Sequence, residues 1–336
     1  MKFEKIKKEY SKKIKKIHEY NKSYYDDSNS LISDQEYDNL KKEILELEKK
    51  YSFLNHEKSP SKIVGFKPSK NFKKVKHKVP MLSLSNAFSE SDLINFQKKI
   101  INFLDQRTNF EIEYSAEPKI DGISASLFYK NGFFVRGLSR GDGKEGEDIT
   151  ENLRTIKDIP NHIVAKNFPK EIDIRGEVFI QNSDFKKLSN KFANPRNAAS
   201  GSLRQKNPDE TKKIPLKFIA YTFGFEKNMH IKYQSEFLKN LDFWGFKINP
   251  FNKKIIGIKR LLENYIELEK KREKLDFDID GIVYKVNDLN LQKRLGNVAN
   301  APRWAIAHKF SANSSVPEIL NIEIQIGRTG ALTPVA

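Results

Sequence analysis

The stretch Glu117-Pro118-Lys119-Ile120-Asp121-Gly122 decides how this chain is interpreted, because it sets one lysine between apolar neighbours with a carboxylate two residues away on either side. Residues 110–116 alternate apolar and polar, which predicts a strand that Pro118 ends. Lys119 is therefore expected at a strand end, over a pocket. A lysine becomes a nucleophile at neutral pH only when desolvation or nearby cations favour its neutral amine. A lysine in a six-residue pattern of this kind is more often an ordinary surface residue in a turn. Other segments of the chain must therefore decide whether Lys119 is a nucleophile.

Composition limits the possible classes of protein. With 336 residues and 38% apolar residues, the chain is long enough for two or three globular domains. It has no cysteine, which excludes disulfides and thiolate zinc sites within it, and its six histidines are scattered. The lysine-rich start lacks an apolar core segment, and no run of about eighteen apolar residues occurs. We expect a cytoplasmic monomer that does not enter membranes.

The formal net charge of +17 suits a polyanionic partner, because neutralising phosphates releases counterions and drives nucleic-acid binding. Lysine, asparagine, isoleucine and phenylalanine are all plentiful, however, as biased base composition in a genome would also produce. Charge alone therefore does not separate a nucleic-acid partner from an ordinary solvated surface.

The N-terminal part predicts two helices. Apolar residues recur at steps of three or four within residues 3–24 and again within 37–51, with lysines between them. Ser33, with Glu36 three positions later, forms a capping box for the second helix. We expect a helical hairpin that forms a small domain, followed by a polar linker over residues 55–79.

The centre of the chain predicts antiparallel strands. A capped helix from about Ser89 leads to the Lys119 strand, and Asn131-Gly132 between two alternating runs is a strong hairpin signal. Residues 171–180 alternate cleanly with carboxylates on one face, which predicts a pocket wall, although a solvated sheet face fits equally well. The glycine-rich stretch 139–146 is neither a P-loop nor a dinucleotide fingerprint. The predicted fold class is α+β, with a helical hairpin followed by a domain built on antiparallel sheets.

Lys119-Ile120-Asp121-Gly122 resembles the nucleophile motif K-x-D-G of covalent nucleotidyltransferases, and the surrounding segments resemble bacterial NAD-dependent DNA ligases from about Tyr24 to the last residue. The resemblance implies three regions. These are a helical domain that binds nicotinamide mononucleotide (NMN) at residues 1–67, a nucleotidyltransferase (adenylation) domain at 68–315, and a linker with the start of a truncated oligonucleotide-binding (OB) barrel at 316–336. We therefore expect the chain to be a fragment.

The same resemblance implies a reaction. Lys119 would attack NAD, form a covalent lysyl-AMP and release NMN, and AMP would pass to the 5′-phosphate of nicked double-stranded DNA for sealing with Mg²⁺ or Mn²⁺. Glu117 would read the adenine amino group, while Asp121 would orient the amine or relay its proton. Asp121 is also a common residue for capping its own backbone in a turn.

Five further positions resemble the family's adenosine contacts. Arg140 and Glu177 match its ribose-binding positions, and Ser83 and Leu84 match a segment that borders the adenosine. Tyr221 matches the aromatic residue on which adenine stacks. Without the resemblance, core packing would explain Tyr221 better, and a short buried strand would explain Ser83 and Leu84 equally well.

Four cations resemble phosphate-binding positions. Lys285 and Lys309 look like the two lysines that bind the α-phosphate, and as neighbouring cations they would lower the pKa of Lys119. Arg196 and Arg204 lie in a small-residue segment that matches the family, and they are candidates for contacts with the phosphates of the nucleotide or of a DNA nick.

The hairpin decides the choice of nucleotide. Tyr24, Tyr25, Asp34, Tyr37 and Asp38 resemble the segment that holds NMN, and aromatic faces suit a cationic nicotinamide ring. These residues also have purely structural explanations. Tyr24 and Tyr37 lie on the apolar faces of the helices, and Asp34 lies in a first helical turn, where the helix dipole favours a carboxylate. ATP-dependent ligases lack such a hairpin. The alternatives left open are an ATP- or GTP-dependent covalent nucleotidyltransferase, a Schiff-base lysine enzyme, and a non-catalytic basic module that binds nucleic acid.

Overall fold

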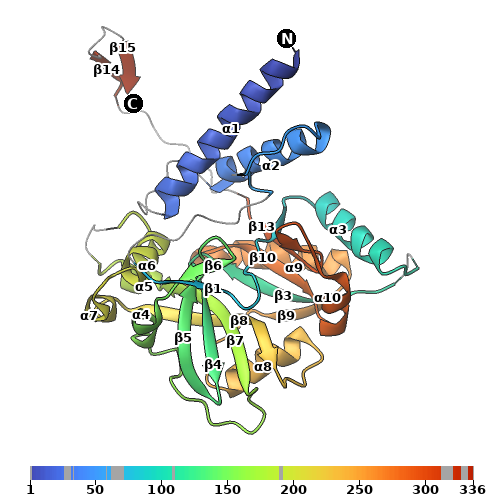
Figure 1. Cartoon of the computed structure of the whole chain (residues 1–336), viewed down its shortest axis with the longest axis vertical. Coiled ribbons are helices and arrows are strands. Elements are labelled where there is room, and N and C mark those ends of the chain that lie inside the picture. Colours follow the sequence, from blue (N-terminus) through green and yellow to red (C-terminus); the bar gives the residue numbers. More distant parts are fainter. Residues whose placement is uncertain are drawn as a thin grey trace.

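The computed structural model describes residues 2–25, 32, 34–57, 59–61, 72–107, 110–188, 192–311, 321–326 and 332–335 (Figure 1). The helices are α1 (Lys2–Tyr25), α2 (Asp34–Lys50), α3 (Glu90–Phe103), α4 (Thr150–Arg154), α5 (Asn182–Phe185), α6 (Pro195–Leu203), α7 (Pro208–Lys212), α8 (Gln234–Phe243), α9 (Ile258–Lys271) and α10 (Leu289–Leu295). The strands are β1 (Lys74–Lys76), β2 (Ser85–Ala87), β3 (Glu113–Ile120), β4 (Ile123–Lys130), β5 (Phe133–Ser139), β6 (Glu145–Glu147), β7 (Glu171–Ile180), β8 (Leu216–Lys227), β9 (Lys253–Ile256), β10 (Ile279–Val286), β11 (Asn297–Val298), β12 (Ala301–Pro302), β13 (Ala305–Lys309), β14 (Glu323–Ile326) and β15 (Leu332–Val335).

Helices α1 and α2 form the predicted hairpin, which lies above the sheets in Figure 1. The hairpin has an apolar core of its own, built on Tyr10, Ile14, Ile17 and Ile44, with Leu54 closing it after α2. These residues follow the three- and four-residue steps of the sequence, so the amphipathic pattern was a sound guide. The predicted cap residue Ser33 lies outside the described residues.

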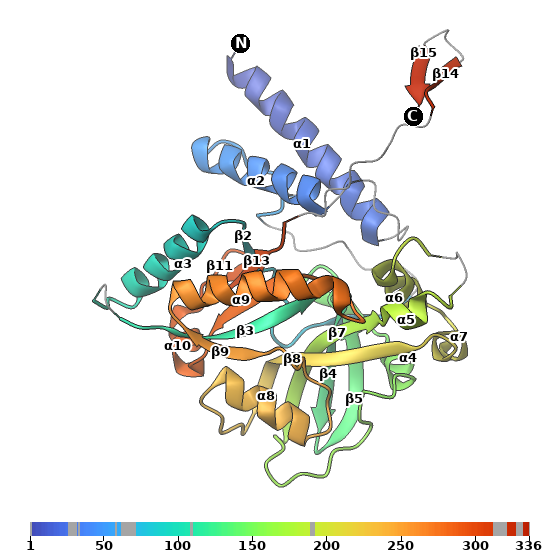
Figure 2. The same cartoon turned by 180° about the vertical axis from the view of Figure 1, so that it is seen from behind.

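Two sheets make the main body. One has five strands in the order β2-β13-β10-β3-β9, in which β2 and β13 run parallel and the other neighbours antiparallel. Its outer face packs on α3 and α9, and Figure 2 shows α9 lying across this sheet. The other is the antiparallel sheet β5-β4-β7-β8, whose outer face packs on α4, α6 and α8. The inner faces of both sheets are left to line a cavity. The α+β class with antiparallel-rich sheets is as predicted.

The carboxylate-bearing strand β7 agrees with its sequence pattern. Its apolar residues Ile172, Ile174 and Val178 enter the core, while Arg175 and Glu177 line the cavity on the other face. The pocket-wall interpretation is therefore confirmed over the solvated face. The Asn131-Gly132 hairpin is also confirmed, with both residues at positive φ between β4 and β5.

Pro118 does not end the ladder, contrary to the prediction. Strand β3 continues through it to Ile120, and Lys119 pairs with Gly281 of β10. On its other edge, β3 pairs with β9 only over residues 113–116, so the missing N–H of Pro118 removes no ladder bond there. Lys119 is thus held by a strand rather than by the turn that follows.

Other expectations met mixed outcomes. Ser89 caps α3, as predicted, through a capping box with Asp92, and the glycine-rich stretch leads into β6 before α4 begins at Thr150. Strands β14 and β15 form an antiparallel pair near the last residues, while the OB barrel stays a prediction. The proposed domain boundaries near residues 67 and 315 lie outside the described residues. In the described part of the chain, no helix combines the length and apolar character needed to cross a membrane.

Candidate active site

A cavity of about 1190 Å³ lies between the inner faces of the two sheets and reaches the hairpin. Most of the predicted site residues whose side chains are described line it: Tyr37, Asp38, Ser83, Leu84, Glu117, Lys119, Arg140, Glu177, Arg196, Tyr221, Lys285 and Lys309. The cavity joins residues from separate sheets and from the hairpin, so it is large enough and varied enough for a ligand with several chemically different parts.

Lys119, Arg196 and Lys309 line one part of the cavity, which we call the reacting end. Asp280 and the predicted residue Asp121 pair with these cations but are not among the residues that line the cavity. The Lys119 Nζ lies 2.9 Å from Asp280 Oδ2, and Lys309 Nζ lies 3.9 Å from the same oxygen. Sequence reasoning had missed Asp280. The signal was present, because Asp280 and Gly281 open the strand that carries Lys285, but the strand pairing that brings it to Lys119 is a tertiary feature.

The pKa of Lys119 differs from the prediction. Burial alone lowers it, and Arg196 also lowers it, but the charge of Asp280 and the further charge of Asp121 outweigh both, so the pKa of Lys119 is raised above its ordinary value. The expected lowering by Lys285 and Lys309 is wrong for this arrangement. Lys119 is held as an ammonium ion, and a proton must leave before it can act as a nucleophile.

Asp121 pairs with Arg196 through a short contact between its Oδ1 and the Arg196 Nη1. Burial raises the pKa of Asp121, but Arg196 and Lys119 together lower it below its usual range. The next residue, Gly122, has to be a glycine. A Cβ at this position would lie 2.4 Å from the Val178 carbonyl oxygen and 2.9 Å from Glu177 Cγ, which is too close. The β3–β4 turn can therefore approach β7 closely enough to join the two sheets at this end.

Glu117 lies two residues before Lys119 on β3 and is the centre of a second group of residues in the cavity, which we call the base end. The Lys285 Nζ lies 2.6 Å from Glu117 Oε2, and the side chains of both residues are less than a tenth exposed. Ser115 Oγ donates to Glu117 Oε1 at 2.8 Å, and Gln234 Nε2 donates to the same oxygen at 3.0 Å. Both Lys285 and Gln234 also donate to the Tyr221 carbonyl oxygen. Sequence reasoning had missed Ser115 and Gln234.

Lys285 is therefore not where the sequence interpretation expected it. In the β3–β10 register it pairs with Ser115, whereas Lys119 pairs with Gly281. Four residues of strand separate these positions, or roughly 13 Å. The Lys285 Nζ contacts Glu117 and the Tyr221 carbonyl oxygen, whereas the Lys309 Nζ lies beside Asp280 and Asp38, so the two lysines contact different groups in the cavity.

Glu177 and Tyr221 meet at Ser124 on the wall formed by the four-stranded sheet. Ser124 Oγ donates to Glu177 Oε2 at 2.9 Å, and Tyr221 Oη lies 3.5 Å from Ser124 Oγ. Burial raises the pKa of Glu177 to about 7, although Lys119 and Arg196 act against it. Arg140 also lines the cavity. The Glu177 carboxyl group, which ionises near neutral pH, offers a hydrogen-bond acceptor, and the Tyr221 ring offers a flat apolar face.

The segment before β2 covers the cavity. Arg175 holds it by donating to the carbonyl oxygens of Val79 and Pro80, and the Ser83 N–H donates to the Asn300 carbonyl oxygen at 2.9 Å. The side chain of Asn300 donates to the Ser61 carbonyl oxygen at 2.9 Å, which ties the residues after the hairpin to the same loop.

The hairpin reaches the reacting end through Asp38. Its Oδ2 lies 2.7 Å from Lys309 Nζ, and the two side chains are only 8% and 16% exposed. Tyr37 Oη donates to Asn21 Oδ1 at 2.8 Å within the hairpin. The side chains of Tyr24, Tyr25 and Asp34 lie outside the described residues.

Arg204 is placed away from the other predicted contacts. Its Nε lies 3.2 Å from Glu147 Oε2, a fully buried carboxylate, and Arg204 is not among the residues that line the cavity. A contact with a nucleotide inside the cavity therefore has no support from its position.

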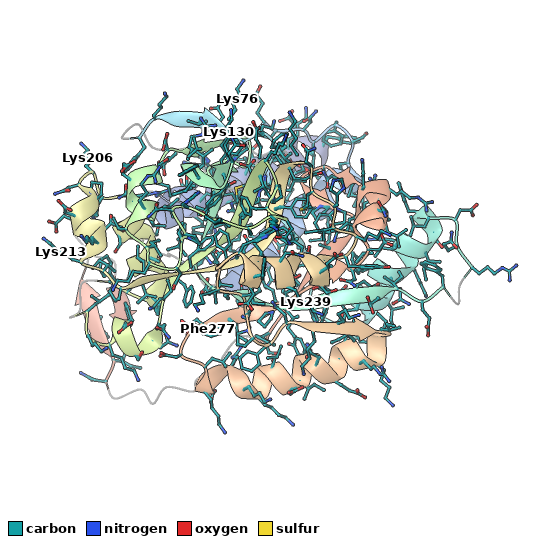
Figure 3. All side chains as sticks on the ribbon, turned by 90° about the horizontal axis from the view of Figure 1, so that it is seen from below. Lys76, Lys130, Lys206, Lys213, Lys239 and Phe277 are labelled. Atoms are coloured by element: carbon teal, nitrogen blue, oxygen red, sulfur yellow. The ribbon has the colours of Figure 1, made fainter. Side chains whose placement is uncertain are left out.

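The described residues contain no group of three or more histidine, cysteine, aspartate or glutamate side chains that could hold a metal ion. One carboxylate oxygen at the reacting end, Asp280 Oδ1, is buried without a hydrogen-bond partner in the described structure. Many other lysines lie outside the cavity: Figure 3 labels Lys76, Lys130, Lys206, Lys213 and Lys239, exposed side chains from β1, β4, the loops on either side of α7, and α8. Their spread favours a solvated surface as the origin of much of the charge.

Comparisons with known proteins show which family this sequence matches. Residues 69–313 match the family described as NAD-dependent DNA ligase adenylation domain, and residues 3–65 match the DNA ligase-like, N-terminal NAD⁺-binding domain. A DNA ligase of Pelagibacter ubique (strain HTCC1062) is 72% identical over 98% of this chain and 48% of its own length. A DNA ligase of Parvibaculum lavamentivorans is 46% identical over 95% of this chain and 46% of its own. The chain thus spans about half the length of these curated relatives.

Among solved structures, the ATP-dependent DNA ligase of bacteriophage T7 in complex with ATP is 14% identical, with a TM-score of 0.35 over 74% of this chain and 79% of that one. A likeness this weak carries no argument about function.

Proposed function

Because the chain belongs to the NAD-dependent DNA ligase adenylation-domain family, we propose that it transfers the adenylyl group of NAD to Lys119 and releases NMN. The observation that supports this best is the position of Lys119, which lies in one cavity with a buried carboxylate, Glu117, and with the hairpin residues Tyr37 and Asp38. A dinucleotide has a base at each end and phosphates between them, and the cavity has groups for each part.

The base end receives the adenine. Glu117 accepts a hydrogen bond from the adenine amino group, and Lys285, which lies beside it, donates to the neighbouring ring nitrogen instead of to a phosphate. Tyr221 stacks on the base, and Glu177 and Arg140 contact the ribose. Because Glu117 and Lys285 are already paired and buried, this part of the site is formed before the nucleotide arrives.

The reacting end carries the chemistry. The Lys119 Nζ loses a proton to Asp280, its partner at 2.9 Å, and attacks the α-phosphorus of NAD. A phosphorus–nitrogen bond forms, and the bond from the α-phosphorus to the bridging pyrophosphate oxygen breaks, so NMN leaves with its phosphate. Arg196 and Lys309 exchange their present carboxylate partners for phosphate oxygens and stabilise the charge that develops there.

The hairpin holds the departing half. Tyr37 and Asp38 line the cavity beside Lys309, and we assign Tyr24, Tyr25 and Asp34 to the same NMN-binding group on the resemblance alone. The division of the chain at about residues 67 and 315 is part of this proposal.

Mg²⁺ fits the reacting end in one respect. It is commonly held by one or two carboxylates together with substrate phosphates, and Asp280 Oδ1 is a buried carboxylate oxygen without a partner in the described structure. Bound there with the nucleotide, the ion would neutralise phosphate charge. Manganese would be held by the same oxygen.

The later steps belong to the longer proteins of the family. In such a protein AMP passes to the 5′-phosphate of a nick in double-stranded DNA, which is then sealed during DNA replication or repair. Arg196 and Arg204 are the candidates here for contacts with DNA phosphates. Cytoplasmic location and a monomeric state stay predictions.

Intact-protein mass after incubation with NAD tests the proposal. The chain should gain the mass of one AMP with NAD and not with ATP, and Lys119→Ala should abolish the gain. Lys239→Ala, which changes an exposed lysine of α8, is the matched control and should label normally. Labelling by ATP, or labelling of Lys119→Ala, would overturn the assignment. We expect this chain to seal nicked DNA poorly, and efficient sealing would contradict that part.

A further inference from the structure

Gln234 contacts residues of the base end but does not itself line the cavity. It is the first residue of α8, the residue is 1% exposed, and it is not among the residues that line the cavity. Its Nε2 donates to Glu117 Oε1 at 3.0 Å and to the Tyr221 carbonyl oxygen at 2.8 Å. The side chain therefore contacts two groups that face the nucleotide without facing it itself.

The amide orientation of Gln234 follows from these partners. Both neighbouring atoms are acceptors, so the donor end of the amide must face them, and a flipped amide would set an oxygen against the Glu117 carboxylate. In the described structure, Gln234 Oε1 is buried without a hydrogen-bond partner. The two N–H groups of Gln234 are therefore both used as donors, while its oxygen stays buried without a hydrogen bond, which is unfavourable.

Gln234 and Lys285 contact the same pair of residues. The Lys285 Nζ lies 2.6 Å from Glu117 Oε2 and 3.0 Å from the Tyr221 carbonyl oxygen. Since Glu117 belongs to β3 and Tyr221 to β8, the two donors join the five-stranded and four-stranded sheets at the floor of the base end. Ser115 Oγ completes the set on Glu117 Oε1.

These donors fix the direction of the carboxylate. An ionised carboxylate has about four acceptor positions, and three protein donors already use Glu117. The position that remains suits one N–H donor, such as the amino group of adenine. Hypoxanthine carries an oxygen at that point of its ring and a protonated nitrogen beside it, so it would meet the fixed carboxylate and Lys285 with the wrong polarity.

We propose that Gln234 is a positioning residue that sets base specificity, because it holds Glu117 in the one orientation that accepts the adenine amino group and rejects an oxygen there. The inference rests on the proposed function and names a determinant of its substrate choice. A carboxylate freed from Gln234 can turn or take up a proton, and either change would let it accommodate hypoxanthine.

A purely structural role for Gln234 can be separated from this one. The helix is anchored by backbone contacts, since the Gln234 N–H donates to the Asn287 carbonyl oxygen at 2.7 Å and the Ser235 N–H donates to Asn287 Oδ1 at 2.9 Å. Asn287→Ala weakens that anchor without touching Glu117, so it serves as the matched control.

The test compares rates of self-adenylylation with NAD and with nicotinamide hypoxanthine dinucleotide, measured by intact mass. The variant is Gln234→Met, which keeps the side-chain volume but has no N–H donor, and Gln234→Ala replaces it if thermal melts show that the methionine variant does not fold. We expect kcat/KM with NAD to fall about tenfold and the preference for NAD over the hypoxanthine analogue to fall by a similar factor. The preference of Asn287→Ala should stay that of the unaltered chain.

An unchanged preference in the Gln234 variants would overturn the inference, as would an equal loss of preference in Asn287→Ala. The proposed function fails separately, because its failure is an unaltered chain that gains no AMP from NAD at all.

Discussion

Charged groups at the two ends of the cavity are held differently. At the base end, the side chains of Lys285 and Glu117 are 7% and 4% exposed, and additional donors fill the carboxylate. At the reacting end, the side chains of Lys119, Asp280, Arg196 and Asp121 are between 18% and 28% exposed. The Glu117–Lys285 pair is thus almost fully buried, whereas the ion pairs of Lys119 and Arg196 are partly open to solvent; the Lys309–Asp38 pair lies between these extremes. Under the proposed function, the residues that recognise the base would be less exposed to solvent than the residues that react.

The largest effect should come from breaking the buried pair. Glu117→Gln leaves the Lys285 ammonium buried without its counter-charge, and removal of one partner of a buried pair costs about 3–5 kcal/mol. The free energy of unfolding in urea measures this loss. Asp121→Asn, which removes a carboxylate from the more exposed pair with Arg196, is the control and should cost clearly less. Equal losses in the two variants would contradict the contrast between the ends.

At the reacting end the large effect should be on rate. Asp280→Asn removes the proton acceptor of Lys119, and we expect self-adenylylation with NAD to slow by about a hundredfold. Asp280 also raises the pKa of Lys119, so its removal should move the rise of the pH–rate profile to lower pH. Stopped time courses analysed by mass across pH 6–10 would show both changes.

Asp278→Asn supplies the control for that prediction. Asp278 lies two residues earlier, is exposed, and accepts from Asn182 Nδ2 at 3.0 Å instead of from a cavity residue. Its variant should keep the rate and the pH profile. If Asp280→Asn labelled as quickly as Asp278→Asn, Asp280 would have no part in activating Lys119.

The same contrast explains what could be predicted from the sequence. Lys119 and Glu117 were found through the motif and its family resemblance, and Glu177 also through the alternation of its strand, which tells which side chains share a face; all three line the cavity. Lys285 was assigned to the wrong end because its neighbours depend on the register of β10 against β3. No local pattern contains that register.

Asp280, Gln234 and Ser115 were missed for a related reason. Each acts through a contact with a residue on another segment or two positions along its own strand, and none belongs to a motif that identifies its role. The continuation of β3 through Pro118 was likewise hidden, because it depends on which edge of the strand has a partner at that point. Helices with strong amphipathic patterns and the Asn131-Gly132 hairpin needed no such information.

Between the two ends, Glu177 should give a pH-dependent change in stability. Its pKa of about 7 lies above the usual value because of burial, so the folded chain binds the proton more tightly than the unfolded chain. This contribution to stability is present below about pH 4.5 and is lost as pH rises through 7. Glu177→Gln cannot ionise, and relative to the unaltered chain its free energy of unfolding should gain on the order of 2 kcal/mol between pH 5 and pH 8.

Glu171→Gln, at the start of the same strand, is the control with the opposite sign. A hydrogen bond from Lys78 lowers the pKa of Glu171, so its ionised form favours the folded state and the glutamine variant should be the less stable protein at pH 8. Urea unfolding at the two pH values decides the matter. A difference between Glu177→Gln and the unaltered chain that does not change with pH would show that Glu177 stays ionised.

The smallest effect concerns the contact between the hairpin and the reacting end. Asp38 pairs with Lys309, and the proposed function requires that carboxylate to turn to NMN when NAD binds. Asp38→Asn should therefore raise the KM for NAD about tenfold, the size expected for one charge-assisted hydrogen bond, with little change in kcat. The reverse reaction of the adenylylated chain with NMN should need proportionally more NMN.

Glu43→Gln distinguishes that role from a general loosening of the hairpin. Glu43 is on the same helix and pairs with Lys13 at 2.6 Å inside the hairpin, at a side-chain exposure of 55%. Its loss should leave both KM values unchanged. If instead Asp38→Asn lowered the KM for NAD, the Asp38–Lys309 pair would act mainly as a competitor of the phosphate, and the exchange of partners at the reacting end would be a barrier to binding instead of a part of it.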